Sequence, residues 1–367
     1  MGSDYRNQHY TPKFYLRNFS LNKEGKQIGV FVTSKELFIP SSKLKTQGTS
    51  PYFYGKDGKI ENALGDIESE TAPILQQVIS SKMIPRHGAK EHFTILYFVT
   101  LMTLRNPIES SGILASGKKL RETLHEMSDG RVEIETDQMT SKEDAIKMAL
   151  SHLDMCYEAC VDLKLKLLIN NTDTPFLSSD NPIVKYNQFL EQKKWNGAIT
   201  GYGLVGLQLF WPLDPTIMLL FYDNSIYKVG DKRDNFLSIV NSKEVDELNL
   251  LQFLNCDSLI FCNERVSKSY LEKISKASFR FAKANQPISG IFPLTIKANK
   301  DEQEGQLIRQ GETECKIRLE IRNIGISKKG ESYQFTDRAV QVRPGVEAIL
   351  SKFGYDQIKK YQLPVKR

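Results

Sequence analysis

Three polar residues carry side chains suited to acid–base or phosphate chemistry, and each stands at the end of a different stretch of the chain. His9 can gain or lose a proton near neutral pH. Arg105 follows an apolar segment, where a guanidinium is costly to leave without a carboxylate or an anionic ligand. Asp180 follows a strand-like stretch, and such ends commonly present ligand-facing groups. If the three converge on one cleft, they suit phosphodiester chemistry.

The roles expected for these residues follow from their side chains. His9 would act as general base or acid, Arg105 would bind the phosphate, and Asp180 would accept a proton or bind a divalent metal, Mg²⁺ or Mn²⁺. Asp180 with the later Glu191-Gln192-Lys193 also has the short outline of a restriction-type nuclease core, in which Glu-x-Lys lies on the strand after the Asp. Nearby groups expected to contact a ligand are Gln8, Tyr10, Tyr15, Asn18 and Asn181.

The same residues also have a structural interpretation, which the sequence leaves open. His9 would then hydrogen-bond the backbone and hold the N-terminal segment on the fold. Arg105 and Asp180 would pair with each other as a buried salt bridge. Asp180-Asn181-Pro182 would form an Asx-turn, which favours these residue types.

The elements that must position these groups can be read from the spacing of apolar residues. Alternation predicts strands near 27–32 and 36–39, in the stretch 174–186, and over 204–211 and 216–222. Helical spacing predicts helices at 60–81, with Pro73 inside, and at 90–105, 110–130, 141–168, 240–254 and 266–284. The helix at 90–105 is apolar on nearly every face and is expected to be central. The predicted fold class is α+β, a helical block with a mixed or antiparallel sheet.

The composition excludes several classes of protein. The chain has 367 residues, of which 40% are hydrophobic and 26% charged, so collagen-like, disordered and membrane classes are excluded. The longest apolar run, 93–104, is shorter than the roughly 20 residues of a spanning helix. Five cysteines, an odd number, favour reduced thiols. We therefore expect a cytoplasmic protein without a membrane partner.

The net charge of +6 is concentrated at the C-terminal end. Residues 286–367 contain 15 Lys and Arg against 10 Asp and Glu, so the preceding 285 residues are close to neutral. We expect two parts: an α+β domain over 1–285, and a basic β-rich segment or small domain over 286–367 with strands at 315–326 and 333–342. The basic segment is the place where nucleic acid would be attracted by charge.

Several short motifs resemble those of a bacterial family, the domain-of-unknown-function 4238 family, over about residues 7–285. The motifs are Gln8-His9-Tyr10-x-Pro12, Tyr15-Leu16-x-Asn18-Phe19, Ile60-Glu61, Arg105-x-Pro107, Phe176 to Pro182, and Val240-Asn241 with Leu248-Asn249. The chain has Leu167-Leu168-Ile169 where members often carry a Trp. The family occurs in bacteria, sometimes in defence-associated settings, and has no established reaction.

Two functions are expected from these observations. The first is a cytoplasmic nuclease or related phosphodiester hydrolase, acting as an effector in anti-phage defence. The second is a ligand-sensing or protein-interaction module without turnover, whose basic tail attracts nucleic acid. Walker loops, Gly-x-Gly-x-x-Gly, His-Glu-x-x-His and Gly-x-Ser-x-Gly do not occur in the chain, so no common catalytic motif decides between them.

Overall fold

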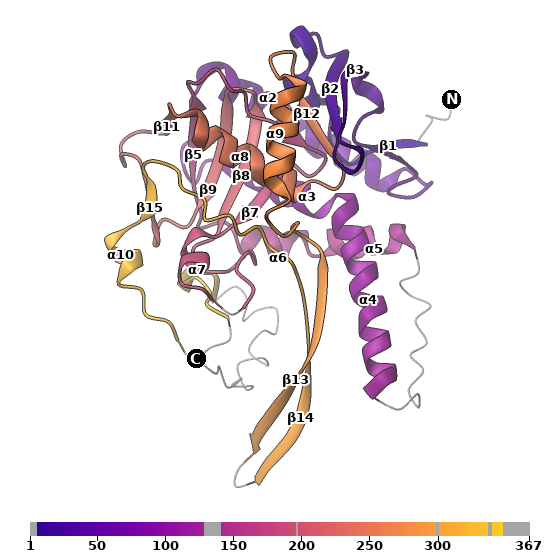
Figure 1. The fold of residues 1–367 in the computed structure, drawn as a ribbon, viewed down its shortest axis with the longest axis vertical. Coiled ribbons are helices and arrows are strands. Elements are labelled where there is room, and N and C mark those ends of the chain that lie inside the picture. The colour runs from indigo at the N-terminus through magenta and orange to yellow at the C-terminus, as the bar shows by residue number, and fades with distance from the viewer. Residues whose placement is uncertain (1–5, 128–140, 196, 299–300, 337–339, 348–367) are drawn as a thin grey trace.

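A mixed five-stranded sheet runs through the middle of the molecule (Figure 1). The computed structural model describes residues 6–127, 141–195, 197–298, 301–336 and 340–347. The strand order is β11 (Phe236–Ile239), β5 (Lys164–Asn170), β9 (Ile217–Tyr222), β8 (Gln208–Asp214) and β7 (Val184–Tyr186). β11 is parallel to β5, and the other neighbours are antiparallel. This confirms the α+β class.

Both faces of this sheet are apolar, because its central strands are covered on both sides. Along β8, Leu209 and Trp211 belong to one hydrophobic cluster, whereas Phe210 between them belongs to the other. This alternation is the two-residue period of a strand. Helix α3 (Lys90–Leu104) contributes to the first cluster and helix α8 (Ser242–Asn255) to the second, so the sheet lies between two helical layers.

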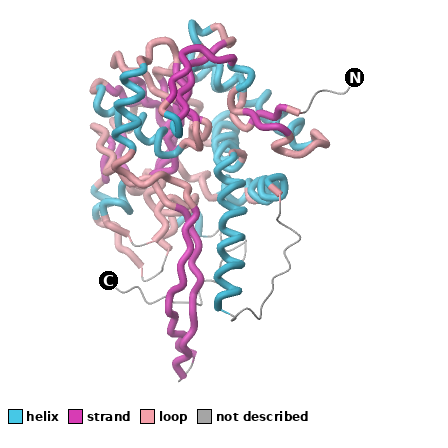
Figure 2. The backbone as a smooth tube through the Cα atoms, turned by 45° about the vertical axis from the view of Figure 1, so that its right-hand side comes forward, coloured by secondary structure: helices cyan, strands magenta, loops and turns pink. Residues whose placement is uncertain are grey.

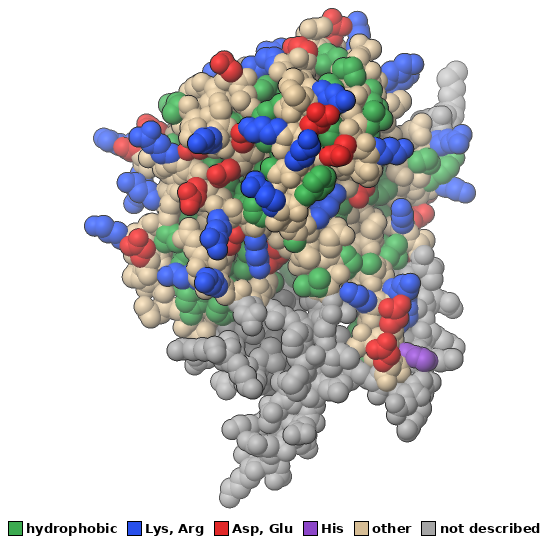
Figure 3. All heavy atoms as spheres, in the orientation of Figure 1, with side chains coloured by type: hydrophobic (Ala, Val, Ile, Leu, Met, Phe, Trp, Pro, Cys, Tyr) green, Lys and Arg blue, Asp and Glu red, His purple; other side chains and the backbone are tan. Residues whose placement is uncertain are grey.

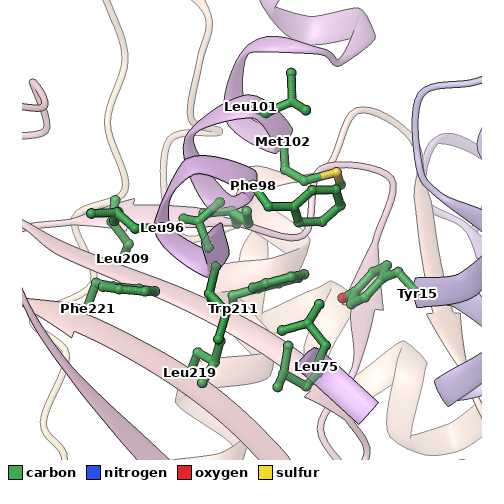
Figure 4. Packing of buried hydrophobic residues seen from close by; sticks show 14 of the residues in the cluster. Tyr15, Leu75, Leu96, Phe98, Leu101, Met102, Leu209, Trp211, Leu219 and Phe221 are labelled. Atoms are coloured by element: carbon green, nitrogen blue, oxygen red, sulfur yellow. The ribbon is translucent and has the colours of Figure 1, made fainter. Parts of the chain in front are cut away.

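Helix α3 is the central helix, as its apolar composition predicts. It is buried from Ile95 onward except at Tyr97. The ring centroid of its Phe98 lies 5.8 Å from that of Trp211, and Trp211 in turn lies 5.6 Å from Tyr15 (Figure 4). Arg105 directly follows the last residue of the helix, so the core packing of the helix fixes the place of that guanidinium. Helices α2 (Lys59–Ser81) and α4 (Pro107–Met127) precede and follow it.

A second, antiparallel sheet brings distant segments together. Its strand order is β3 (Leu37–Lys43), β2 (Gln27–Val32), β12 (Leu259–Cys262) and β6 (Ser178–Ser179). The expected strand pair near the N-terminus is therefore present. Because β6 ends directly before Asp180 and pairs with β12, this sheet places Asp180 against the turn that starts β12.

The single helix expected over 141–168 is wrong. This stretch forms α5 (Lys142–Ser151), α6 (Leu153–Glu158) and then strand β5. Its start is as expected, because the Ser141 hydroxyl accepts a hydrogen bond from the backbone N–H of Asp144. The error has a physical cause: leucines at 163 and 167 continue a helical stripe, but 165 and 167 also alternate as a strand requires, and pairing with β9 decides the outcome.

The expected strands of the C-terminal segment are largely misplaced. A long two-stranded ribbon, β13 (Pro287–Ala298) and β14 (Asp301–Glu312), extends from the body beside α4 (Figures 1 and 2). Residues 301–305, which are rich in Asp and Glu, belong to β14. Within 315–326 the described strand is β15 (Ile324–Ile326), and in 333–342 only an isolated bridge from Leu204 to Val342 is described. Residues 337–339 of the expected strand at 333–342 lie outside the described residues.

The chain after the ribbon is tied back to the body. β15 pairs with β10 (Tyr227–Val229). Arg343 is 1% exposed and donates to both the Asp162 carboxylate, at 2.9 Å, and the Leu204 carbonyl, at 2.8 Å. In the described part of the chain, no helix is long and apolar enough to cross a membrane.

Candidate active site

The N-terminal strand presents the backbone of His9 to two neighbouring helices. β1 (Asn7–His9) pairs antiparallel with β4 (Thr49–Pro51). The bonds Tyr52 N–H to the Arg6 carbonyl and Tyr10 N–H to the Gly48 carbonyl show that even-numbered residues face β4. The N–H and C=O of His9 therefore point away from β4. The N–H bonds to Glu61, and the carbonyl accepts from Arg105 at 2.7 Å.

Gln8 fixes the loop that follows β4. Its side-chain oxygen accepts from the backbone N–H of Tyr54 at 2.6 Å, and its amide nitrogen donates to the Gly55 carbonyl at 2.7 Å. The residue is fully buried. The Gln8 side chain thus satisfies backbone groups of Tyr54 and Gly55, and it positions Tyr54 rather than a ligand.

Arg105 is held by three different partners. Its Nη1 lies 2.8 Å from the Glu68 carboxylate, its Nε donates to the Tyr54 hydroxyl at 3.1 Å, and its Nη2 donates to the His9 carbonyl. The arginine is 1% exposed and Glu68 is 24% exposed. The expected salt bridge with Asp180 is wrong, because the guanidinium turns toward α2 instead.

The imidazole of His9 has one free nitrogen. Its Nε2 is buried and has no hydrogen-bond partner among the described residues. The Lys45 carbonyl accepts a hydrogen bond from the ring, which the other nitrogen must therefore donate. Burial, and then the positive charges of Lys13 and Arg105, lower the pKa of His9 to about 4. At neutral pH the ring is thus neutral, with a free lone pair on Nε2.

Glu61 supplies a carboxyl group to the same cluster. It lies in the first turn of α2, and its Oε2 is buried and unbonded within the part of the chain that the structure describes. Burial raises the pKa of Glu61 and the negative charge of Glu68 raises it further, while Arg105 opposes the shift. His9, Glu61 and Arg105 therefore form a cluster with one free base, one carboxyl group whose pKa is raised and one buried cation.

Asp180 does not join this cluster through its side chain. Its carboxylate accepts hydrogen bonds from the backbone N–H groups of Asp257, Ser258 and Leu259, each at 2.8 Å. Burial raises its pKa to about 6, although these three amides oppose the shift. Its link to the N-terminal segment is its carbonyl oxygen, which accepts from the Thr11 hydroxyl at 3.2 Å. Asp180 thus fixes the turn into β12.

The structure offers no ligand set for a divalent metal around Asp180. Among the described residues, no three His, Cys, Asp or Glu side chains lie close enough to hold a metal ion. The restriction-type outline is also wrong, because Glu191 lies on helix α7 (Gln188–Gln192) and not on a strand. Its carboxylate accepts from the Tyr186 hydroxyl and, at 2.9 Å, from the backbone N–H of Arg318.

Three of the expected ligand-contacting residues lie elsewhere or point inward. Tyr15 is fully buried, and its hydroxyl bonds to Ser178 and to the Pro212 carbonyl, both at 2.7 Å. Tyr10 packs its ring 5.5 Å from that of Phe53, and burial, together with the negative charge of Asp180, raises its pKa. Asn18 lies at the surface and accepts from Gln76 at 3.0 Å.

Asn181 borders a separate small polar cavity. Its amide nitrogen donates to the Asn255 carbonyl at 3.1 Å, while its buried Oδ1 has no partner in the described ranges. The cavity has a volume of about 10 Å³, room for about one water molecule. It is lined by Thr103, Asn106, Ile108, Glu109, Asn181, Ile183, Lys185, Asn255 and Asn285. We expect a bound water to satisfy Oδ1.

The sequence interpretation missed Glu61, Glu68 and Tyr54. Glu61 belongs to the Ile60-Glu61 motif, which was available as a signal but carried no assigned role. Glu68 lies two turns further along α2, at i+7, where a helix face repeats. That spacing gives both carboxylates access to one guanidinium, but only the docking of α2 against α3 shows which guanidinium it is.

Comparison with protein families places these residues in a shared context. Residues 7–265 match the family described as Protein of unknown function (DUF4238), and the chain belongs to that family. The match includes His9, Glu61 and Arg105 and ends before the ribbon. Comparisons with curated proteins and with solved structures found no match.

Proposed function

We propose that this member of the DUF4238 family hydrolyses phosphodiester bonds of nucleic acids at the cluster of His9, Glu61 and Arg105. One observation carries the proposal: buried Nε2 of His9 and buried Oε2 of Glu61 are both left without a hydrogen-bond partner by the described residues. Buried polar atoms normally have partners. A free lone pair on His9 and a carboxyl group on Glu61 are the kinds of group that accept and give a proton in hydrolysis.

The chemistry assigned to each residue follows from its protonation. His9 Nε2 removes the proton from the attacking oxygen, a water or a ribose 2′-hydroxyl, as that oxygen forms its bond to phosphorus. Glu61, whose raised pKa favours the protonated form, gives a proton to the leaving oxygen as its bond to phosphorus breaks. The positive charges of Arg105 and the exposed Lys13 favour the added negative charge on the phosphate.

The proposal is tested by cleavage assays on the purified full chain. End-labelled single-stranded RNA, single-stranded DNA and duplexes are incubated in Mg²⁺, Mn²⁺ or EDTA. We expect cleavage that persists in EDTA, because no three His, Cys, Asp or Glu side chains of the described residues lie close enough to hold a metal ion. His9→Asn and Glu61→Gln should each reduce the rate by about 10²-fold or more.

Matched controls separate chemistry from folding. Asn places an amide nitrogen near the position of imidazole Nδ1, so His9→Asn keeps a donor for the Lys45 carbonyl and removes only Nε2. The exposed His152 and the exposed Glu70 on the same helix α2 provide control variants, His152→Asn and Glu70→Gln. Cleavage that is unchanged in His9→Asn and Glu61→Gln, or absent under every condition, overturns the proposal.

The cellular role that we propose is that of an effector in anti-phage defence in the bacterial cytoplasm. Induced expression should slow growth for the wild type and not for His9→Asn. Phage plating efficiency should likewise fall only with the active chain. Equal growth and plating with both chains would contradict this role without affecting the assay of hydrolysis.

A further inference from the structure

A second concave region lies between α7 and the chain that follows the ribbon, and we name it the α7 groove. Its volume is about 620 Å³. It is lined by Leu190, Glu191, Lys194, Trp195, Phe281, Lys316, Ile317 and Arg318. In Figure 3 the surface over α7 carries several Lys and Arg side chains. None of these residues belongs to the cluster at His9.

The end of α7 places Lys194 and Trp195 at the groove. The N–H of Trp195 bonds to the Leu190 carbonyl at 3.0 Å, and the N–H of Lys194 bonds to the Glu191 carbonyl at 2.9 Å. This is the Schellman arrangement, in which the residue after the helix adopts a left-handed conformation. Lys194 does so with φ 51°, at a position where glycine is usual.

The opposite wall repeats this feature. Arg318 has φ 55°, also in the left-handed region. Its backbone N–H donates to the Glu191 carboxylate, whose other oxygen accepts from the Tyr186 hydroxyl. Glu191 is the one acidic side chain among the lining residues, and both of its carboxylate oxygens already accept hydrogen bonds within the protein. The exposed cations Lys194, Lys316 and Arg318 outnumber this carboxylate along the groove, and Lys316 Nζ also lies 3.8 Å from the carboxylate of Glu314.

Aromatic rings accompany these cations. Trp195 stacks on Phe335, with ring centroids 5.2 Å apart and planes inclined by 14°. Phe281 also lines the groove, and the guanidinium of Arg280 lies 5.9 Å from its ring centroid. Half-buried rings beside exposed cations are the arrangement with which proteins bind unpaired bases and their phosphates.

We propose that the α7 groove binds an aromatic base together with its phosphate, as part of a single-stranded nucleic acid. Trp195 or Phe281 would stack on the base, and Lys194, Lys316 and Arg318 would contact phosphates. A free nucleotide has the same chemistry, so the experiment includes both sources. The inference does not rest on the proposed hydrolysis, because it concerns other residues and is tested by binding alone.

Tryptophan fluorescence provides a direct test. The chain has two tryptophans, of which Trp211 is fully buried in the core and Trp195 lines the groove. The probes are a 12-nucleotide oligouridylate, a 12-base-pair duplex and uridine monophosphate, titrated into the full chain carrying His9→Asn. We expect quenching by the oligonucleotide and weaker quenching by the duplex, whose bases are already paired and stacked. If the titrations show that uridine monophosphate binds as tightly as the oligonucleotide does, the ligand is the free nucleotide.

Two variants locate the binding. Trp195→Ala should abolish the quenching and weaken oligonucleotide binding, measured by fluorescence anisotropy of a labelled strand, about tenfold. The double variant Lys194→Gly with Arg318→Gly removes two cations where glycine fits the backbone, so the fold is retained. It should weaken binding and reduce the slope of log affinity against log salt by about 2.

A matched control uses two lysines with the same backbone conformation elsewhere. Lys23 and Lys82 have φ of 59° and 54°, and the double variant Lys23→Gly with Lys82→Gly should bind as the wild type does. The inference is overturned if none of the three probes quenches the fluorescence, or if binding is unchanged in Trp195→Ala and in Lys194→Gly with Arg318→Gly.

Discussion

The Nη2 atom of Arg105 donates a hydrogen bond of 2.7 Å to the carbonyl oxygen of His9, 96 positions earlier in the chain. The backbone N–H of His9 bonds to Glu61. The peptide group before His9 therefore bonds to a carboxyl group, and the peptide group after it bonds to a cation. These two bonds hold the backbone of His9 between helix α2 and the end of helix α3.

Arg105 is expected to be the most sensitive residue of the cluster for stability. Arg105→Ala leaves the Glu68 carboxylate and the His9 carbonyl without their buried donor, which should lower the free energy of unfolding by about 3 kcal/mol. Glu68→Ala should cost less, about 1 kcal/mol, because Glu68 is 24% exposed and solvent screens its charge. Urea denaturation followed by circular dichroism measures both. A larger effect of Glu68→Ala than of Arg105→Ala would contradict this assignment.

Asp180 is expected to matter for stability and not for the chemical step. In Asp180→Asn the side-chain NH₂ group replaces one acceptor and meets the backbone N–H groups that start β12. The free energy of unfolding should fall by about 3 kcal/mol. Activity per folded molecule, measured at a temperature where both proteins are folded, should stay within about twofold. A loss of cleavage that added Mg²⁺ or Mn²⁺ restores would instead assign Asp180 to a metal site.

The stability of the protein should fall on mild acidification. The pKa values of His9 and of the buried His92 are both lowered from 6.5 to about 4. Between pH 6.5 and pH 4 the unfolded chain therefore binds protons that the folded chain does not, which costs about 3 kcal/mol per histidine. Asp180, whose pKa is raised to about 6, acts in the opposite direction between pH 6 and pH 3.8. These three groups together leave a net loss of about 3 kcal/mol, which the raised pKa of Glu61 reduces.

His9→Asn isolates the share of one histidine. Its free energy of unfolding, measured by urea titration from pH 7 to pH 4.5, should depend less steeply on pH than that of the wild type. The difference in slope should approach about 1.4 kcal/mol per pH unit, the value for one proton. Parallel curves for the two proteins would show that the pKa of His9 is not lowered by folding.

Cleavage should have an optimum on the acid side of neutrality. The rate is expected to fall below about pH 4 as His9 becomes protonated. It should also fall at higher pH as Glu61 loses its proton, at a pH above the usual range of a glutamate because burial raises its pKa. Profiles of kcat/KM from pH 4.5 to pH 9 give the basic limit. A basic limb that is the same in Glu61→Gln as in the wild type would remove Glu61 from the role of acid.

Local sequence patterns predicted the elements whose apolar spacing is unambiguous. Helix α3 and strand β2 were expected at their observed places, and β3 was expected in its first half, because a continuous apolar helix and a short alternating pair leave few alternatives. Strand β5 was mistaken for helix because its leucines fit both periods, and the sheet partner β9 decides between them. The ribbon was missed because its charged outer end resembles a loop when its cross-strand pairs are unknown.

The candidate site was predictable only in part. His9 and Arg105 were identified from their chemistry, and the structure joins them. The pairing of Arg105 with Glu68, and the capture of Asp180 by three backbone amides, depend on how α2 and β12 dock. Such partner choices are tertiary, so residue types and spacing in the sequence do not determine them.

The most direct test of the central claim is the cleavage rate of His9→Asn in EDTA, compared with the wild type on the same single-stranded RNA. The variant keeps a donor to the Lys45 carbonyl and loses the free Nε2. We predict a rate at least about 10²-fold lower, with a midpoint of urea unfolding at pH 7.5 close to that of the wild type. A stable variant that cleaves at the wild-type rate would contradict the proposal that His9 is the general base.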